Sequence, residues 1–377
     1  MVYLDYAAST PPYPEVIEEV TKAMQEYYAN ASAEDHALGL QAKEIFLQAR
    51  KDIAEFIGAK PKNVIFTSGA TESINLALQG FTFYFHERHC RKPRILCSPI
   101  EHASVLNTLK ALHSKNWIDL KFFSVNHYGF YDLTHLKADL DHTDLFCMMA
   151  INNETGVILP FAEAGSLCRE RNIPFFCDAS QAVGKIPISL EEHHISAISF
   201  SGHKLYGPKG IGVLAFQDDF LFRPLFYGGS QQHSIRPGTL PLPLILGLRK
   251  ALVIRNKVMQ QEKKKLSNLR KQLIEGLRHI NGIKIHTPLD NSWPGFLHFT
   301  LKDVYSKMVL ANMPEIAISS SAACSSGLER PSHVLSALGV DENRRYGAFR
   351  ICLGAFTTKE EVDFFLNQFK NFMIDFV

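Results

Sequence analysis

The chain has 377 residues, a length that is ordinary for a two-domain enzyme. Hydrophobic residues make up 46% of it and charged residues 21%, as in globular proteins, and the net charge of +2 gives no electrostatic attraction for nucleic acid or an acidic membrane surface. The first residues lack the basic start and apolar core of a signal peptide, and no apolar run could span a bilayer. The seven cysteines include no CxxC pair, which argues against disulfides and zinc. We therefore expect a cytoplasmic protein without a metal site.

Seven short apolar runs between residues 64 and 216 predict the strands of one sheet. Their near-continuous hydrophobicity is typical of strands covered on both faces, as in a mainly parallel sheet. Helical patterns at residues 71–85 and 101–115 separate some of them, so we expect an α/β domain with right-handed crossovers. Residues 197–216 instead contain two strands joined by a glycine-rich turn, which predicts a hairpin or an antiparallel edge. The seven runs are VIFT, RILCSP, KFFSV, LFCMMAI, PFFCDAS, AISF and GVLAF.

A long helical pattern over residues 244–280 follows these strands. Its basic segment is better explained as a solvated helix face than as a nucleic-acid site, because glutamates interrupt it. Shorter strand and helix signals alternate beyond residue 281 and predict a smaller α+β domain, against which the N-terminus is expected to pack. We therefore expect a large domain at residues 12–250 and a small domain formed by residues 1–11 and 251–377.

The first segment with chemical significance is VIFTSGATESINLAL, where a strand ends in a turn of small residues and a helix begins near Thr71. Exposed backbone N–H groups and the helix dipole make such a turn an anion site, suited to a phosphate. Turns of this composition also serve simply as helix caps. The turn alone leaves both interpretations open.

Two later strands end in residues that together predict a cofactor. FFCDASQAVGK places Asp178 at the end of a buried strand, with Gln181 one helical turn further on, and AISFSGHK ends in Lys204. Ligands of open α/β sheets gather at the carboxyl ends of strands, where a carboxylate can keep a pyridinium nitrogen protonated or merely cap a helix. A partly desolvated lysine has a lowered pKa, which favours the neutral amine that forms imines. A single lysine in a turn is usually a surface residue, but with Asp178 it predicts pyridoxal 5'-phosphate bound to Lys204 as a Schiff base.

Six motifs together resemble the cysteine desulfurases of the class V aminotransferase family. With YLDYAAS at the start and FRICLGAFTTKEEVD near the end, the similarity covers essentially the whole chain. It implies a fold-type I pyridoxal-phosphate-dependent transferase, with a mainly parallel seven-stranded sheet in the large domain and a smaller α+β C-terminal domain. The six motifs are EHASV, INNETG, CDASQAVGK, SFSGHKLYGPKG, RPGTLP and SSSAACSSGLERPSHVL.

The resemblance also implies roles for residues around the cofactor ring. Lys204 would hold the cofactor and move the α-proton of the substrate, and His102 would lie over the ring face and assist proton transfer. Asp178 would pair with the ring nitrogen, and Gln181 and Asn153 would contact the ring hydroxyl.

Further residues would bind the phosphate and the substrate. Arg350 would bind the substrate carboxylate, for which its planar fork is well shaped. Asn153 is expected to bind substrate as well, and so is Asn30, in a segment similar to an active-site rim. The implied phosphate ligands are Ala70, Thr71, Ser201, His203 and, from the partner in a homodimer, Thr239.

Cys324 narrows the range of reactions that the chain could catalyse. It lies in SSSAACSSG, a run of small polar residues without strand or helix periodicity, so we expect an exposed loop. In the family this cysteine attacks the sulfur of bound L-cysteine, which leaves L-alanine and a persulfide. The loop resembles that of the long-loop group, which passes sulfur to an acceptor protein, either an iron–sulfur scaffold or a tRNA-thiolation relay.

Three alternatives remain open. The chain could be a selenocysteine lyase, a class V aminotransferase in which Cys324 is incidental, or a noncatalytic scaffold, although a scaffold has no physical need for the full set of site residues. The segment GGSQQHSIRPGT also departs from the family pattern, with Gln231 and Gln232 where many relatives have His-Glu and Pro237 where serine is common. These changes bear on substrate and acceptor preference.

Overall fold

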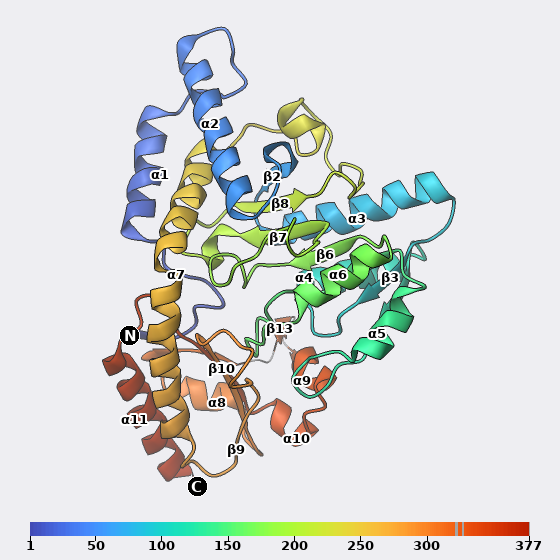
Figure 1. The fold of residues 1–377 in the computed structure, drawn as a ribbon. Coiled ribbons are helices and arrows are strands. Elements are labelled where there is room, and N and C mark those ends of the chain that lie inside the picture. Colours follow the sequence, from blue (N-terminus) through green and yellow to red (C-terminus); the bar gives the residue numbers. More distant parts are fainter. Residues whose placement is uncertain (321–322, 326–327, 377) are drawn as a thin grey trace.

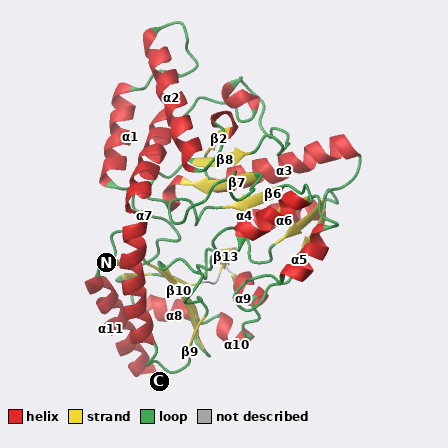
Figure 2. Ribbon diagram, viewed as in Figure 1, coloured by secondary structure: helices red, strands yellow, loops and turns green. Residues whose placement is uncertain are grey.

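The computed structural model describes residues 1–320, 323–325 and 328–376 (Figure 1). A seven-stranded sheet lies at the centre of the larger part of the molecule, with helices on both faces (Figure 2). Its strands are β2 (Val64–Thr67), β3 (Arg94–Cys97), β4 (Asp119–Phe122), β5 (Leu145–Cys147), β6 (Phe175–Asp178), β7 (Ala197–Ser201) and β8 (Gly212–Phe216). The helices of this part are α1 (Pro14–Glu26), α2 (Ala37–Phe56), α3 (Ala70–His89), α4 (Ala103–Ser114), α5 (Leu133–Leu140) and α6 (Phe161–Glu170).

The strand order in this sheet is β2-β8-β7-β6-β5-β3-β4. Neighbours from β4 to β7 run parallel, whereas β8 is antiparallel to both β7 and β2. The predicted mainly parallel seven-stranded sheet is therefore confirmed, and so is the antiparallel pair within residues 197–216. The strand expected from KFFSV begins two residues earlier, at Asp119, and ends at Phe122.

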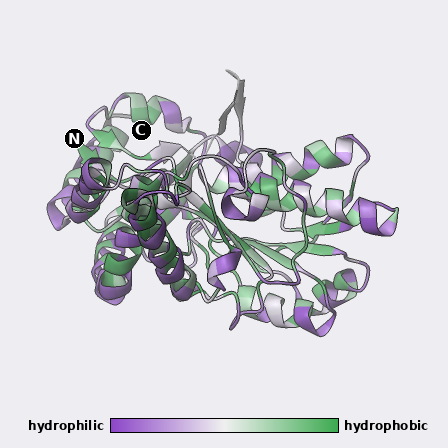
Figure 3. Cartoon of the chain, turned by 90° about the horizontal axis from the view of Figure 1, so that it is seen from above, coloured by the Kyte–Doolittle hydropathy of each residue, from purple (hydrophilic) through white to green (hydrophobic). Residues whose placement is uncertain are grey.

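The strands are apolar because both faces of the sheet are covered. In β6, Phe176 packs with residues of α3 and α4, whereas Phe175 and Cys177 belong to the core on the opposite face. Side chains of a strand point alternately to the two faces, so a strand buried on both sides is hydrophobic at every position. Figure 3 shows the central strands in hydrophobic colours and the outer helix faces in hydrophilic ones.

The smaller part of the molecule contains a four-stranded sheet with the order β12-β15-β10-β9. The N-terminal strand β1 (Val2–Tyr3) pairs in parallel with β11 (Ile316–Ala317) of this part. A separate antiparallel pair joins β13 (Ala323–Ser325) to β14 (Leu328–Arg330). The remaining elements here are β9 (Ile283–Ile285), β10 (Phe296–Leu301), α8 (Ser306–Ala311), β12 (Ser319–Ser320), α9 (His333–Ala337), α10 (Glu342–Arg345), β15 (Ala348–Cys352) and α11 (Lys359–Phe376).

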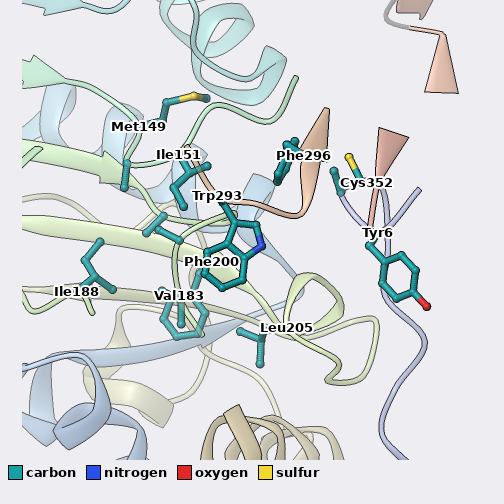
Figure 4. Packing of buried hydrophobic residues seen from close by; sticks show 14 of the residues in the cluster. Tyr6, Met149, Ile151, Val183, Ile188, Phe200, Leu205, Trp293, Phe296 and Cys352 are labelled. Carbon is teal, nitrogen blue, oxygen red and sulfur yellow. The ribbon is translucent and has the colours of Figure 1, made fainter. Parts of the chain in front are cut away.

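One helix, α7 (Leu242–Leu277), runs beside both parts and packs against α1, α2 and α11 (Figure 1). The buried core is also continuous between the parts, and Figure 4 shows Phe200, Trp293, Phe296 and Cys352 within it. The expected domain boundary at residue 250 falls inside α7 and stays a prediction. Within the described ranges, no helix combines the length and apolar character that crossing a membrane requires.

Candidate active site

A cavity of about 770 Å³ lies where β6 and β7 end and α3 begins. Most of the residues proposed from the sequence line this one space, although they come from segments spread over most of the chain. The exceptions are Asn30, Thr239 and Cys324. The proposed residues in the lining are Ala70, Thr71, His102, Asn153, Asp178, Gln181, Ser201, His203, Lys204 and Arg350.

The turn before α3 gives the cavity an anion-binding wall. Among the described residues, no side chain caps the N-terminus of α3 at Gly69, so the first N–H groups of the helix can bind a ligand. Gly212 allows this turn to lie against β8, since a Cβ atom there would be 2.4 Å from the carbonyl carbon of Gly69. The phosphate interpretation of the turn is thus supported over the simple side-chain cap.

The end of β6 supplies a carboxylate and an amide. Asp178 is 5% exposed, and its Oδ1 accepts hydrogen bonds from the backbone N–H of Ser180 (2.9 Å) and from the Ser180 hydroxyl (2.6 Å). Gln181 donates from Nε2 to the carbonyl of Ala7 (2.9 Å), and its Oε1 accepts from Lys185 (3.0 Å). Both side chains are therefore fixed before any ligand binds.

Lys204 lies in the 3₁₀ turn Gly202–Lys204 directly after β7. Its Nζ donates to the carbonyls of Ala7 (2.6 Å) and Ala8 (2.7 Å), which come from the N-terminal segment. Burial and the positive charge of Arg350 lower the pKa of Lys204 to about 8, against the opposing charges of Asp178 and Asp5. A lysine with this pKa has a substantial neutral fraction near pH 7, as imine formation requires.

Two histidines lie beside Lys204. Burial and the charges of nearby lysines together lower the pKa of His203 to about 4, so its ring is neutral at pH 7. His102 caps α4, and its Nδ1 accepts from the backbone N–H of Ser104 (3.2 Å). The side chain of His102 is accessible to solvent in the cavity, yet partial desolvation by the surrounding protein lowers its pKa, and Asp178 opposes the shift. The neutral ring of His102 therefore carries its proton on Nε2.

Arg350 on β15 contributes a guanidinium group to the wall of the cavity. It forms an ion pair with Asp5 (Nη2 to Oδ1, 2.7 Å) and donates to the Ser319 hydroxyl (2.8 Å) and to the Asn153 carbonyl (3.0 Å). Two buried atoms of this wall have no hydrogen-bond partner among the described residues: Nε of Arg350 and Oδ1 of Asn153. A ligand with an acidic oxygen and a donor group would satisfy both.

These residues fit pyridoxal phosphate. The free N-terminus of α3 and neutral His203 suit its phosphate, Asp178 suits its ring nitrogen, and Lys204 suits its aldehyde. The unpaired atoms of Asn153 and Arg350 lie on the wall that a substrate amino acid would contact. Every part of the cofactor thus has a chemically matched group in the lining.

Three proposed site residues do not line the cavity. Asn30 is exposed, and its Oδ1 accepts from the backbone N–H of Ser32 (3.0 Å); its contact with the substrate stays a prediction. Thr239 is exposed as well, which agrees with its proposed role toward a partner's phosphate. Cys324 lies on β13, paired with Glu329, and its side chain lies outside the described residues. The expectation of a loop without strand structure is wrong for residues 323–325, because the pairing of β13 with β14 depends on backbone hydrogen bonds and needs no side-chain periodicity.

Several groups that complete the site were not found by the sequence analysis. The carbonyls of Ala7 and Ala8 bind Lys204 through the backbone, which no residue type encodes. Asp5 lies in the YLDYAAS motif, and that motif is the one sequence feature that could have pointed to it. Lys185 follows Gln181 by one helical turn in QAVGK, a spacing that indicates contact between the two side chains.

The fold and the cavity are those of an α/β enzyme with a lysine after a strand end, whose amine is suited to imine formation. The chain belongs to the aminotransferase class-V family, whose model matches residues 2–365, and enzymes of this family depend on pyridoxal phosphate. It is 36% identical to the cysteine desulfurase IscS of Klebsiella pneumoniae (strain 342) over 375 residues, which cover 98% of this chain and 92% of that one. It is also 36% identical to the cysteine desulfurase IscS of Salmonella typhi over 368 residues, with 96% and 90% covered.

Solved structures agree with this assignment. A NifS-like protein superposes with a TM-score of 0.92 at 34% identity, with 100% of both chains covered. The protein SspA in complex with cysteine superposes with a TM-score of 0.83 at 32% identity, with 95% of this chain and 100% of that one covered. The family implied by the sequence motifs is therefore confirmed.

Proposed function

We propose that this protein is a cysteine desulfurase that converts L-cysteine to L-alanine and forms a persulfide on Cys324. The observation that carries the proposal is that three side chains line one cavity: Lys204, Asp178 and Arg350. The lysine would form the imine, the aspartate would pair with the ring nitrogen, and the arginine would bind the substrate carboxylate. Relatives named cysteine desulfurase and a related protein that binds cysteine support the choice of substrate.

The attachment of β13 and β14 distinguishes this reaction from simple amino transfer. Before β13, Ser319 accepts from Arg350 and donates to Asp5 (2.8 Å). After β14, Ser332 donates to the buried carboxylate of Glu154 (2.6 Å), and His333 donates to the carbonyl of Glu101 (2.8 Å). Glu154 and Glu101 directly adjoin Asn153 and His102 of the cavity lining. The segment that carries Cys324 is therefore attached at both ends to the walls of the cavity.

The residues of the chain divide the work of this reaction. Bound pyridoxal phosphate would withdraw electrons from the α-carbon and β-carbon of the substrate. Arg350 would bind the substrate carboxylate, and Lys204 and His102 would carry protons. The pKa of Lys204 is lowered to about 8 and that of His102 is lowered from its ordinary value, so the neutral forms of both side chains are available to accept a proton. The thiol of Cys324 would take the sulfur, so that L-cysteine and a protein thiol give L-alanine and a protein persulfide.

Product analysis tests the proposal. Purified protein with pyridoxal phosphate should be yellow, and Lys204→Ala should abolish the colour. With L-cysteine and a reductant, the wild type should release equimolar alanine and sulfide. Cys324→Ser should stop this release but keep the colour. The control Cys90→Ser, at an exposed cysteine, should keep both the release and the colour. Full turnover by Cys324→Ser would contradict the persulfide mechanism. Stoichiometric amino transfer to a keto acid would favour a class V aminotransferase, and a strong preference for selenocysteine would favour a lyase.

We also infer a homodimer with shared active sites. Arg236 forms an ion pair with Glu72 of α3 (2.8 Å), and Gln232 donates to and accepts from the backbone of Phe66, which holds the segment leading to Thr239 on the outside of the sheet. There Thr239 could reach the cavity of a second copy. Mixing two inactive variants, Lys204→Ala and Thr239→Asp, should restore activity by forming one intact site per mixed dimer. Lack of recovery, or full activity of a monomer, would refute shared sites.

The sulfur acceptor and the cellular compartment complete this proposal. We expect transfer from Cys324 to an acceptor protein in the cytoplasm, for iron–sulfur cluster assembly or tRNA thiolation. Transfer of ³⁵S from labelled cysteine to each class of acceptor would distinguish them, and release of all sulfur as free sulfide in the presence of both would argue against a relay.

A further inference from the structure

Lys185 is placed behind the cavity, where its amine contacts two groups of the site. The left-handed backbone of Gly184 (φ +76°) ends the turn that follows β6. The Nζ of Lys185 then donates to Oε1 of Gln181 (3.0 Å) and to the backbone carbonyl of Lys204 (3.3 Å). It is not part of the cavity lining.

These contacts belong to a closed ring of hydrogen bonds among Lys185, Gln181, the Ala7 carbonyl and Lys204. The other end of the Gln181 amide donates to the carbonyl of Ala7 (2.9 Å), and the same carbonyl accepts from Nζ of Lys204 (2.6 Å). Because the amine of Lys185 donates and the carbonyl of Ala7 accepts, the two groups together fix which end of the Gln181 amide points to Ala7 and the cavity. Without Lys185, the amide oxygen would lose its donor, and only the carbonyl of Ala7 would hold this orientation of the amide.

We propose that Lys185 is a positioning residue, which orients the Gln181 amide so that its NH₂ group faces the cofactor. This role rests on the proposed function, because it assumes that Gln181 contacts pyridoxal phosphate. A ring oxygen of the cofactor accepts hydrogen bonds, so the NH₂ orientation binds it and the reversed orientation repels it.

The hydrogen bond from Lys185 to Gln181 does not depend on the protonation state of Lys185, although this lysine titrates near neutral pH. Burial, and after it the charges of Arg255 of α7 and Lys204, lower the pKa of Lys185 to about 7, whereas Glu262 of α7 and Cys352 of β15 oppose the shift. Both the ammonium and the neutral amine carry N–H groups that donate to Oε1. The orientation of Gln181 is therefore retained as Lys185 titrates.

Binding of pyridoxal phosphate to the apoprotein tests this role without any turnover. Lys185→Met should weaken binding about three- to tenfold, the effect of one lost hydrogen bond. Gln181→Ala should weaken it by a similar factor, and the double variant should be no weaker than Gln181→Ala alone, because Lys185 acts through Gln181. Lys185→Arg, which keeps the donors, should restore most of the affinity. Lys257→Met removes an exposed lysine of α7 and is the matched control.

The binding measurements distinguish a failure of the positioning role of Lys185 from a failure of the proposed function. Multiplicative effects of Lys185→Met and Gln181→Ala, or unchanged affinity in folded Lys185→Met, would overturn the positioning role while leaving the proposed function intact. If Lys185→Met does not fold, the same cycle with Lys185→Gln gives the coupling. A wild-type apoprotein that does not bind pyridoxal phosphate would overturn both proposals.

Discussion

The titration of Lys204 gives the sharpest quantitative test of the site. A lysine with the ordinary pKa of 10.5 would be neutral in about 0.03% of molecules at pH 7, whereas a pKa of about 8 makes about 9% neutral. The neutral amine alone attacks an aldehyde, so the cavity should accelerate capture of pyridoxal phosphate at pH 7 by about 300-fold relative to an unperturbed lysine. Capture by the apoprotein should accelerate about tenfold per pH unit and level off near pH 8.

Removing Arg350 tests the cause of this shift. After burial, the charge of Arg350 is the largest influence that lowers the pKa of Lys204, and Asp178 acts in the opposite direction. Arg350→Gln should therefore move the midpoint of the rate profile to higher pH, and Asp178→Asn should move it to lower pH. Stopped-flow absorbance between pH 6 and 10 measures both, with Lys204→Ala as the blank. A wild-type midpoint near 10, or shifts of the same sign in the two variants, would refute this electrostatic account.

Three further predictions concern stability, each measured by urea unfolding. Burial raises the pKa of Glu154 from 4.5 to about 7, so between these pH values the folded state binds a proton that the unfolded state does not. The free energy of unfolding should therefore fall by about 3 kcal/mol as pH rises from 4.5 through 7. Glu154→Gln should remove this dependence, and an unchanged slope between pH 5 and 8 would contradict it. Gln232→Ala leaves the backbone groups of Phe66 at the edge of β2 unpaired and should cost about 1–3 kcal/mol, whereas a cost near zero would mean that water replaces the amide. Ser332→Ala removes both the N-cap of α9 and the donor to Glu154 and should cost about 1–2 kcal/mol, against almost nothing for the exposed hydroxyl of Ser114.

The central sheet was predictable because its strands are buried on both faces, which leaves continuous apolar runs in the sequence. The placement of Asp178 and Lys204 followed from the same signal, since each comes directly after such a run and the carboxyl ends of parallel strands meet at one edge. The offset of β4 arose because its residues are mostly exposed or partly exposed, so hydrophobicity does not mark its ends.

The parts of the site that sequence reasoning missed depend on the backbone or on distant partners. Ala7 and Ala8 act through carbonyl groups, and the ion pair of Asp5 with Arg350 joins residues that are 345 positions apart. No local pattern encodes either. The pairing of Cys324 with Glu329 was hidden for a related reason, because small residues show no alternation whether or not the backbone is paired.

The contacts of the N-terminal segment also have a consequence for biosynthesis. Residues 5–8 are synthesised long before their partners, which include Lys204 and Arg350, and the backbone N–H of Cys352 donates to the carbonyl of Leu4. At about 5–20 residues per second, translation needs roughly 20–70 s to reach these partners. The pocket is therefore completed only after residue 352 has been made, and incorporation of the cofactor is expected to follow that step.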